Sequence, residues 1–198
     1  MKIIETKVVF DKISKKSRGN LDRAINDIQS SIKAVVWPIG SRKFTIFPGK
    51  HANGVKPIKK ESMNYLDKNG WVLEKRMSLV DGMRPGPIDA VKEFSDGKLF
   101  AMEWETGNIS SSHRALNKMA LAIFRKQLMG GVLVLPSQAL YPYLTDRIGN
   151  IKEIEPYIPL FQTLPIEEGF LSIIVIEHDN ESDQVSKIPK GTDGRALK

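Results

Sequence analysis

The chain has 198 residues, 41% of them hydrophobic, which is enough for one folded domain with a buried core. It has no cysteine, so disulfides, zinc–thiolate sites and thiol nucleophiles are excluded. Lysine and arginine number 30 against 23 acidic residues, and the resulting net charge of +7 suits a polyanionic partner such as nucleic acid.

The N-terminal stretch MKIIETKVVFDK has charged residues that interrupt every apolar run. Such a stretch is too polar for a signal peptide or a membrane span. Because cysteine is also absent, a cytoplasmic protein without membrane contact is expected.

The next part of the chain predicts a helix and a short strand. Apolar residues recur at helical spacing from Leu21 to Val35, so a helix is expected there, with Asn20 as its N-cap and Trp37-Pro38 beyond its end. Residues 43–47 are expected to form a short strand, and Asn53-Gly54 a turn.

The middle of the chain predicts two helices around a pair of strands. A helix over 57–69 opens with proline and is closed by the glycine that follows it. Two strands are expected on either side of the turn signal Asp96-Gly97. A second helix, capped by Ser110 or Ser111, is expected to run to about residue 128 and to stop at a glycine pair.

The last third of the chain predicts two buried strands, GVLVLP and FLSIIVIE. Between them, SQALYPYLTDR is expected to form a short helix or turn, and NIKEIEPYIPLF a helix with Asn150 and Glu153 as a capping pair. Strands and helices interleave, which predicts an α/β fold with a mixed central sheet and helices on both faces. The apolar pattern stops after Glu177, so residues 1–176 are expected to form a single domain and 177–198 an extended tail.

Three carboxylates flank the expected hairpin: Asp89 precedes the turn, and Glu103 and Glu105 follow it. Strand alternation puts the two glutamates on one face. A two-residue loop would pair position 89 with 104, whereas a three-residue loop over 95–97 pairs it with 103. The longer loop is favoured because Gly97 then ends it in the left-handed conformation.

In the favoured register the three acids converge, and their mutual repulsion requires a neutralising charge. Oxygen-rich clusters of this kind hold Mg²⁺, here with the carbonyl of Trp104 as a further ligand. A glutamate beside such a site could take the proton of a water that attacks phosphorus, which describes phosphodiester hydrolysis. On spacing alone, an exposed strand face that carries acids is the alternative.

The segments GPIDAVKEF, MEWETGNISSSHRALNK, YLTDR and IPKGTDG occur in this order, and together they resemble the BamHI family of type II restriction endonucleases. The likeness covers most of the chain and implies a PD-(D/E)xK nuclease core in which Glu105 replaces the usual lysine. It implies Asp89, Glu103 and the Trp104 carbonyl as metal ligands, Glu105 as the base, and Glu74 as an acid near a second metal.

The same resemblance implies an enzyme that cuts double-stranded DNA at the palindrome GGATCC, between the two guanines. Two Mg²⁺ ions per active site are implied; Mn²⁺ would substitute, and Ca²⁺ would bind without supporting cleavage. A homodimer is implied through helices 110–128 and 151–161. A cognate methyltransferase is expected to protect the host DNA, without being a binding partner.

For DNA recognition, the resemblance implies base contacts from several short segments. Those matched to the inner base pairs are Asn108 and Ser110, with Arg114 one helical turn further on. The outer G·C pair is matched by Asp146 and Arg147, which suits the chemistry, since arginine binds guanine and aspartate accepts from cytosine. In the tail, Asp193 and Gly194 match DNA-contacting positions, and Lys59 is expected to contact a phosphate or water near the scissile bond.

Three other functions are compatible with a basic α/β protein. A nuclease with a different target, such as a structure-specific repair nuclease, would not require the base-contacting residues. A DNA-binding protein on a degenerate nuclease fold would lack one of the three carboxylates, but all three are present. A basic structural protein would bind any DNA sequence, with affinity that falls steeply as salt rises.

Overall fold

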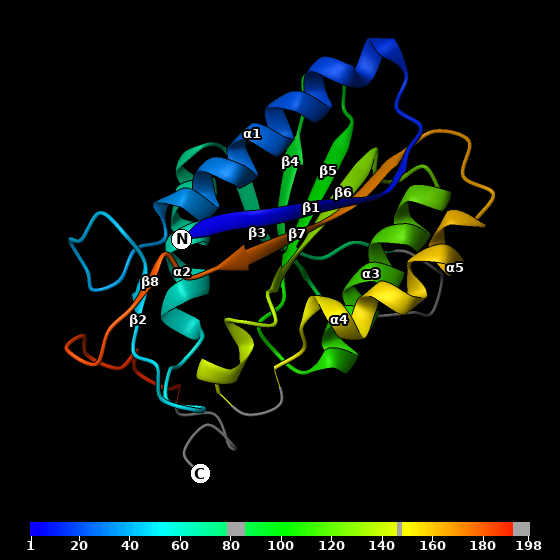
Figure 1. The fold of residues 1–198 in the computed structure, drawn as a ribbon. Helices are drawn as coiled ribbons and strands as arrows, with labels where there is room; N and C mark the ends of the chain where they lie inside the picture. Colours follow the sequence, from blue (N-terminus) through cyan, green and yellow to red (C-terminus); the bar gives the residue numbers. More distant parts are fainter. Residues whose placement is uncertain (79–85, 146–147, 192–198) are drawn as a thin grey trace.

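A six-stranded sheet lies at the centre of the protein (Figure 1). The computed structural model describes residues 1–78, 86–145 and 148–191. In spatial order the strands are β1 (Lys2–Asp11), β7 (Phe170–Glu177), β6 (Gly130–Pro136), β5 (Leu99–Trp104), β4 (Ile88–Glu93) and β3 (Trp71–Lys75). The two central pairs, β5–β6 and β6–β7, are parallel, and the pairs toward both edges are antiparallel. The predicted mixed sheet is confirmed.

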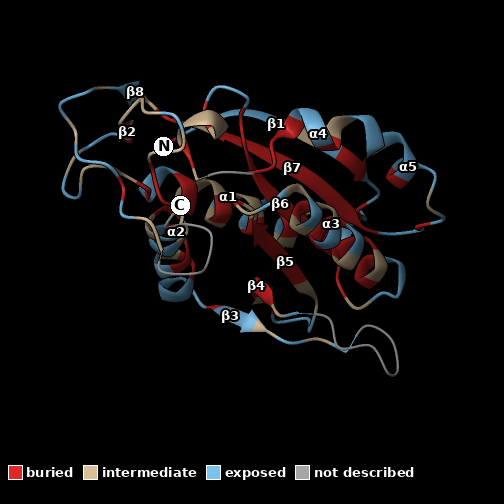
Figure 2. Ribbon diagram, turned by 90° about the horizontal axis from the view of Figure 1, so that it is seen from below, coloured by how far each residue is buried: buried red, intermediate tan, exposed pale blue. Residues whose placement is uncertain are grey.

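Helices cover both faces of this sheet, as expected. On one face lie α1 (Arg18–Ala34) and α2 (Lys56–Lys68), and on the other lie α3 (Ile109–Phe124), α4 (Ile151–Ile154) and α5 (Ile158–Gln162) (Figure 1). Strand side chains alternate, so the sheet contributes to two separate cores. Met102 and Trp104 pack on the α1 side, whereas Leu133 and Ile173 pack on the α3 side. Strands β5, β6 and β7 are therefore buried between two layers (Figure 2).

The first strand, β1, was not predicted from the sequence. It forms ten residues of antiparallel edge strand along β7. The pairing shifts register between Ile3 and Glu5 and again between Val8 and Phe10. These two irregularities interrupt the apolar alternation that would have identified a strand. Within the described ranges, no helix combines the length and the apolar character needed to cross a bilayer.

Two of the predicted helix starts are wrong. Helix α1 begins at Arg18 after a short 3-10 turn, so Asn20 lies inside the helix and donates a hydrogen bond to Asp96 Oδ2 at 3.1 Å. Helix α3 is capped by Asn108, whose side chain accepts from the Ser111 amide, and not by either predicted serine. Asparagine with an extended backbone is among the best N-caps, which explains the choice.

The predicted end of α3 is also wrong, because the helix stops at Phe124. Lys126 adopts a left-handed conformation with φ of 59° and terminates it. The glycine pair that was expected to stop the helix begins β6 instead. A Cβ at Gly131 would lie 2.6 Å from the sulfur of Met119. The pair is therefore explained by close packing, not by a turn.

Several other expectations agree with the structure to within a few residues. Helix α2 begins and ends within one residue of its predicted limits. Asn150 and Glu153 form the expected capping box. The helix that follows them is shorter than predicted, because Pro156 and Pro159 divide it into α4, a 3-10 turn and α5.

The chain beyond β7 folds back onto the domain. A two-stranded parallel sheet joins β8 (Asn180–Glu181) to β2 (Thr45–Ile46), at one end of the molecule (Figure 1). Further along, Ile188 is 1% exposed and belongs to the core on the α1 side. At Asn53-Gly54, where a turn was predicted, the chain instead pairs with two distant segments. Asn53 forms a bridge with Leu144, and the Gly54 amide donates to the Ile188 carbonyl.

Candidate functional site

The hairpin of β4 and β5 sets the position of two carboxylates. Ala90 pairs with Met102, so Asp89 lies across from Glu103. The loop closes with hydrogen bonds from Phe94 N to Lys98 O at 2.9 Å and from Gly97 N to Phe94 O at 2.8 Å. Gly97 has a φ of 77°, in the left-handed region. The three-residue loop is confirmed, and the two-residue alternative is wrong.

Asp89 and Glu103 are both buried, with 8% and 2% of their surface exposed. Asp89 Oδ2 accepts from the Trp104 amide at 2.8 Å, and the Asp89 amide donates to Glu103 Oε2 at 3.3 Å. Each carboxylate is therefore held by the backbone of the other strand. Burial raises the pKa of Glu103, the nearby charge of Asp89 raises it further, and Lys118 opposes both effects.

Two lysines from opposite layers neutralise this pair. Lys59, on α2, places Nζ 2.6 Å from Asp89 Oδ1. Lys118, on α3, forms an ion pair with Glu103 Oε1 and donates to the Pro87 carbonyl at 2.8 Å. The sequence indicated a role for Lys59 only. Lys118 lies in the same motif as Asn108, but nothing in its spacing shows that it reaches back to β5.

Glu105 lies just beyond β5, where its amide donates to the Val134 carbonyl at 3.0 Å. Burial raises the pKa of its carboxyl to about 7, and the charges of Asp89 and Glu103 contribute to the rise. Lys59 and Arg114 lower it, without cancelling the increase. Glu105 is therefore half protonated near neutral pH, which suits a group that accepts a proton during a reaction.

This raised pKa predicts a pH-dependent stability difference between the metal-free protein and its Glu105→Gln variant. Because the folded state holds the proton more tightly than the unfolded chain, Glu105 costs the fold progressively more stability as the pH rises from its ordinary pKa of 4.5 to about 7, and the loss is complete above that. Unfolding by urea in EDTA should give similar free energies at about pH 4, below both pKa values. At pH 8 the variant should be more stable, by up to about 3 kcal/mol. Glu167→Gln, at an exposed position, is the control. The prediction would be contradicted if the unfolding free energies of Glu105→Gln and the wild type differed by the same amount at both pH values.

Glu74 lies on the strand next to Asp89, but it is not buried as Asp89 and Glu103 are. On β3, Leu73 pairs with Ala90 and Lys75 with Ile88, so Glu74 lies across from Asp89. Its backbone has a left-handed φ of 51°, and its side chain is exposed. Among the described residues, no group of three or more histidine or acidic side chains is arranged so that it could hold a metal ion. The Asp89–Glu103 pair nevertheless fits a cation, because two lysine ammonium groups already lie against its oxygens.

The residues matched to base contacts lie at the exposed start of α3. Asn108, Ser110 and Arg114 are all exposed, and Arg114 donates to the Ser111 hydroxyl at 3.3 Å. Two of them, Asn108 and Ser110, line a cleft of about 670 Å³, together with His51, Gln138, Thr145, Ile148 and Lys152 among others. The cleft thus joins the start of α3 to the loop that follows Tyr143.

The remaining residues expected to contact DNA, Asp146, Arg147, Asp193 and Gly194, lie outside the described residues. Their neighbours are described. Ile148 forms a bridge with Asn108, and the Gly149 amide donates to the Gly107 carbonyl at 2.9 Å. Ile148 and Gly149 are therefore bonded to the residues at the start of α3.

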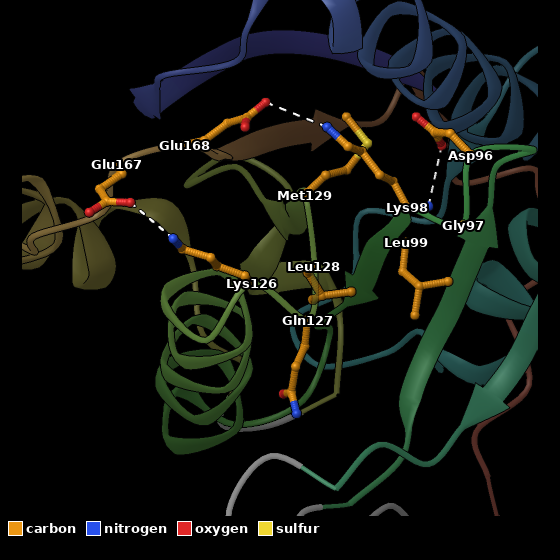
Figure 3. Close-up of a pocket in the computed structure, with 10 residues that line it drawn as sticks. All are labelled: Asp96, Gly97, Lys98, Leu99, Lys126, Gln127, Leu128, Met129, Glu167 and Glu168. Carbon is orange, nitrogen blue, oxygen red and sulfur yellow. Dashed lines mark hydrogen bonds and ion pairs between the residues drawn. The ribbon is translucent and has the colours of Figure 1, made fainter.

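A second pocket, of about 300 Å³, lies at the opposite end of β5, around the hairpin loop (Figure 3). Its charged side chains pair with one another. Lys126 lies 3.0 Å from Glu167, and Lys98 lies 3.6 Å from Glu168. Because these charges are mutually neutralised, this pocket offers no excess positive charge for a polyanion and is remote from Asp89 and Glu103.

The sequence is similar to one family of known proteins over most of its length. Residues 1–195 match the family model described as restriction endonuclease BamHI. The chain is 52% identical over 174 residues to the type II restriction enzyme OkrAI of Oceanobacter kriegii, covering 88% of this chain and 89% of that protein. It is 37% identical over 181 residues to the type II restriction enzyme BamHI of Bacillus amyloliquefaciens, covering 88% and 83%.

The fold also resembles a solved structure of low sequence similarity. A crystal structure of restriction endonuclease BglII complexed with a DNA 16-mer matches with a TM-score of 0.64. The match covers 90% of this chain and 79% of that one, at 9% identity. It confirms the restriction-endonuclease-like fold expected from the sequence.

Proposed function

Because the chain belongs to the BamHI family of type II restriction endonucleases, we propose that it cleaves both strands of DNA at GGATCC, between the two guanines. The observation that carries the proposal is the buried pair Asp89 and Glu103, whose charges act on Glu105, three residues before Asn108 in the lining of the cleft at the start of α3. Cytoplasmic action on double-stranded DNA, without membrane contact, is part of this proposal.

The carboxylates of Asp89 and Glu103, with the Trp104 carbonyl, would hold Mg²⁺, and Glu74 would contribute to a second ion. Their oxygen donors suit Mg²⁺ and, equally, Mn²⁺ or Ca²⁺. Bound there, a divalent metal would supply positive charge that polarises the phosphate and lowers the pKa of water. Lys59 and Lys118 show that these carboxylates accept positive charge in the folded protein.

Glu105 would accept the proton of the attacking water as the new bond from oxygen to phosphorus forms and the bond from phosphorus to the 3′ oxygen breaks. A proton from solvent then neutralises the leaving 3′ oxygen. The pKa of Glu105, about 7, suits this role near neutral pH. Lys59 would contact the scissile phosphate or a water beside it, because its ammonium already lies against Asp89.

Recognition is assigned to two groups of residues. Asn108 and Ser110 would face the inner base pairs, with Arg114 one turn along α3, and the exposure of all three residues supports this assignment. The outer G·C pair is assigned to Asp146 and Arg147, and Asp193 and Gly194 would approach DNA from the tail, residues 177–198. Arginine binds guanine in two-point contacts and aspartate accepts from cytosine.

A palindromic site matches the two-fold symmetry of a homodimer, and the proposed enzyme is one. The contact is assigned to α3 and the segment 151–161. This face exposes large apolar side chains: Phe124 is 50% exposed, Tyr157 49% and Leu160 64%. The His113 ring packs edge-on against Tyr157, with centroids 4.7 Å apart, and links the two elements within one subunit.

Digestion of a plasmid with a single GGATCC sequence tests the proposal, with a scrambled site as the control. We expect one double-strand cut with Mg²⁺, no cut with EDTA or Ca²⁺, and no cut by Asp89→Ala or Glu105→Ala proteins. Specific retention in a gel shift without cleavage would identify a non-cleaving binding protein. Cutting at other sequences would retain the nuclease and overturn the GGATCC assignment.

A further inference from the structure

The two carboxylate oxygens of Glu103 have different surroundings. Oε2 accepts from the Asp89 amide at 3.3 Å. Oε1 is buried and, within the described parts of the chain, accepts no hydrogen bond of ordinary geometry, although the ammonium of Lys118 lies against it as an ion-pair partner. Charge attraction therefore holds Oε1 more than a directed hydrogen bond does. Such an attraction is not specific to an ammonium group, so another cation at the same place would also satisfy this oxygen.

Lys118 is the less accessible of the two lysines at this carboxylate pair. Its side chain is 10% exposed, whereas that of Lys59 is 32% exposed. The ammonium of Lys59 can therefore turn toward solvent, but that of Lys118 stays among protein groups. The carboxylates of Asp89 and Glu103 and the two ammonium groups carry no net charge between them. A further cation is thus attracted strongly only if one ammonium withdraws.

Two backbone carbonyls give the Lys118 ammonium a second set of partners. Its Nζ donates to the Pro87 carbonyl at 2.8 Å and to the Gly86 carbonyl at 3.4 Å, both just before β4. An ammonium group has three donors. Lys118 can therefore keep these two contacts when it gives up Glu103. Its release does not leave a buried charge without hydrogen-bond partners, which would be the costly outcome.

We propose that Lys118 is a positioning residue that acts as an internal counter-ion of Glu103 and competes with the divalent metal for its Oε1. This inference rests on the proposed function, because it takes Glu103 as a metal ligand. The competition predicts an unusual direction of change. Loss of a residue that merely supports a metal site weakens metal binding or leaves it unchanged, whereas loss of a competing cation strengthens it.

Titration of the DNA-free protein with Ca²⁺ measures this competition by calorimetry, at about pH 8, where an ordinary carboxyl group is ionised. Ca²⁺ binds oxygen ligands, and no reaction is needed for the measurement. We expect the Kd of Lys118→Met for Ca²⁺ to be at least about tenfold lower than that of the wild type, which corresponds to about 1.4 kcal/mol. The reason is that the variant leaves Glu103 as a buried carboxylate without its partner.

Urea unfolding gives a second measurement that does not depend on calorimetry. A ligand that binds only the folded state stabilises it more as its Kd falls. The same concentration of Ca²⁺ should therefore raise the unfolding midpoint of Lys118→Met more than that of the wild type. If Lys118→Met does not fold even with Ca²⁺, Lys118→Gln takes its place, because glutamine lacks the charge but still carries a donor for the Pro87 carbonyl.

Two control variants show whether the effect belongs to Glu103. Lys126→Met removes the same charge from an exposed pair with Glu167 and should leave the Kd for Ca²⁺ within about twofold of the wild-type value. The double variant Lys118→Met with Glu103→Gln lacks both the competitor and the ligand. It should bind Ca²⁺ no more tightly than the wild type.

The outcomes separate the inference from the function on which it rests. If neither the wild type nor the Lys118 variant binds Ca²⁺, the metal site of the proposed function is overturned, and this inference with it. If both bind Ca²⁺ and the variant binds equally or more weakly, only the inference is overturned. Tighter binding that persists in the double variant would also overturn it, because the ion would then lie away from Glu103.

Discussion

If Glu105 is the general base proposed above, its replacement by glutamine is expected to reduce the rate of cleavage at the proposed site, GGATCC, by about 10²–10⁴-fold, the usual contribution of such a base. Glutamine keeps the size of the side chain but cannot accept the proton of the attacking water. The effect should appear in single-turnover cleavage with saturating enzyme and Mg²⁺. Substrate affinity should persist, because the substitution removes a negative charge near the DNA phosphates.

The design of this experiment separates chemistry from folding. Gel shifts in Ca²⁺ should show the variant bound to GGATCC at least as tightly as the wild type. Glu167→Gln removes an exposed carboxylate 3.0 Å from Lys126 and should leave cleavage unchanged. A Glu105→Gln protein that cuts within about tenfold of the wild-type rate would show that another group, or solvent, takes the proton.

Replacing Lys118 by methionine is expected to destabilise the metal-free protein by about 3–5 kcal/mol, the penalty for leaving one partner of a buried ion pair alone. The Lys118 side chain is 10% exposed and that of Glu103 is 3% exposed, so water cannot solvate the remaining carboxylate well. Asp89, across the strand pair, adds repulsion. Urea unfolding in EDTA at pH 8, where carboxylates are ionised in the unfolded chain, measures the loss.

Two further variants test whether burial of the ion pair explains the large loss of stability expected for Lys118→Met. Lys126→Met breaks the pair with Glu167, whose side chains are 78% and 81% exposed, and should cost no more than about 1 kcal/mol. The double variant Lys118→Met with Glu103→Gln removes both buried charges and should recover most of the lost stability. Equal losses for Lys118→Met and Lys126→Met would contradict the proposed dependence on burial.

The hairpin that carries the carboxylates could be predicted because its register depends on local turn chemistry. Gly97 suits the left-handed position that ends a three-residue loop, and the structure shows that φ together with the pairing of Phe94 with Lys98. Alternation along β5 then separates Glu103 from Met102 and Trp104 without knowledge of any other element. The facing positions of Asp89 and Glu103 follow from these two local rules.

The cations that neutralise those carboxylates could not be predicted in the same way. Lys59 and Lys118 come from helices on opposite faces of the sheet, 30 residues before Asp89 and 15 after Glu103. Only the packing of α2 and α3 brings them together, and periodicity carries no information about it. The N-cap of α3 was missed for a different reason, because Asn108, Ser110 and Ser111 all suit a helix start.

The assignment of individual roles rests on resemblance more than on pattern. Glu74 has no distinguishing spacing, and its position across from Asp89 becomes visible only when β3 is paired with β4. Asn53 appeared to be a simple turn residue because asparagine followed by glycine is a strong turn signal. Its side chain instead bonds to Tyr143 and Ile188, which lie 90 and 135 residues away in the sequence.

The two lysine–carboxylate pairs also constrain how the gene can change over generations. Under the proposed mechanism, a mutation that removes Asp89 or Glu103 would abolish cleavage, and it would also leave Lys59 or Lys118 without the ion-pair partner seen here. Natural selection then acts on abundance and solubility as well as on cutting, since a weakened fold exposes the chain to proteases. Inactive descendants of this protein should therefore carry second substitutions at the matching lysine, or retain the acids and lose Glu105 first.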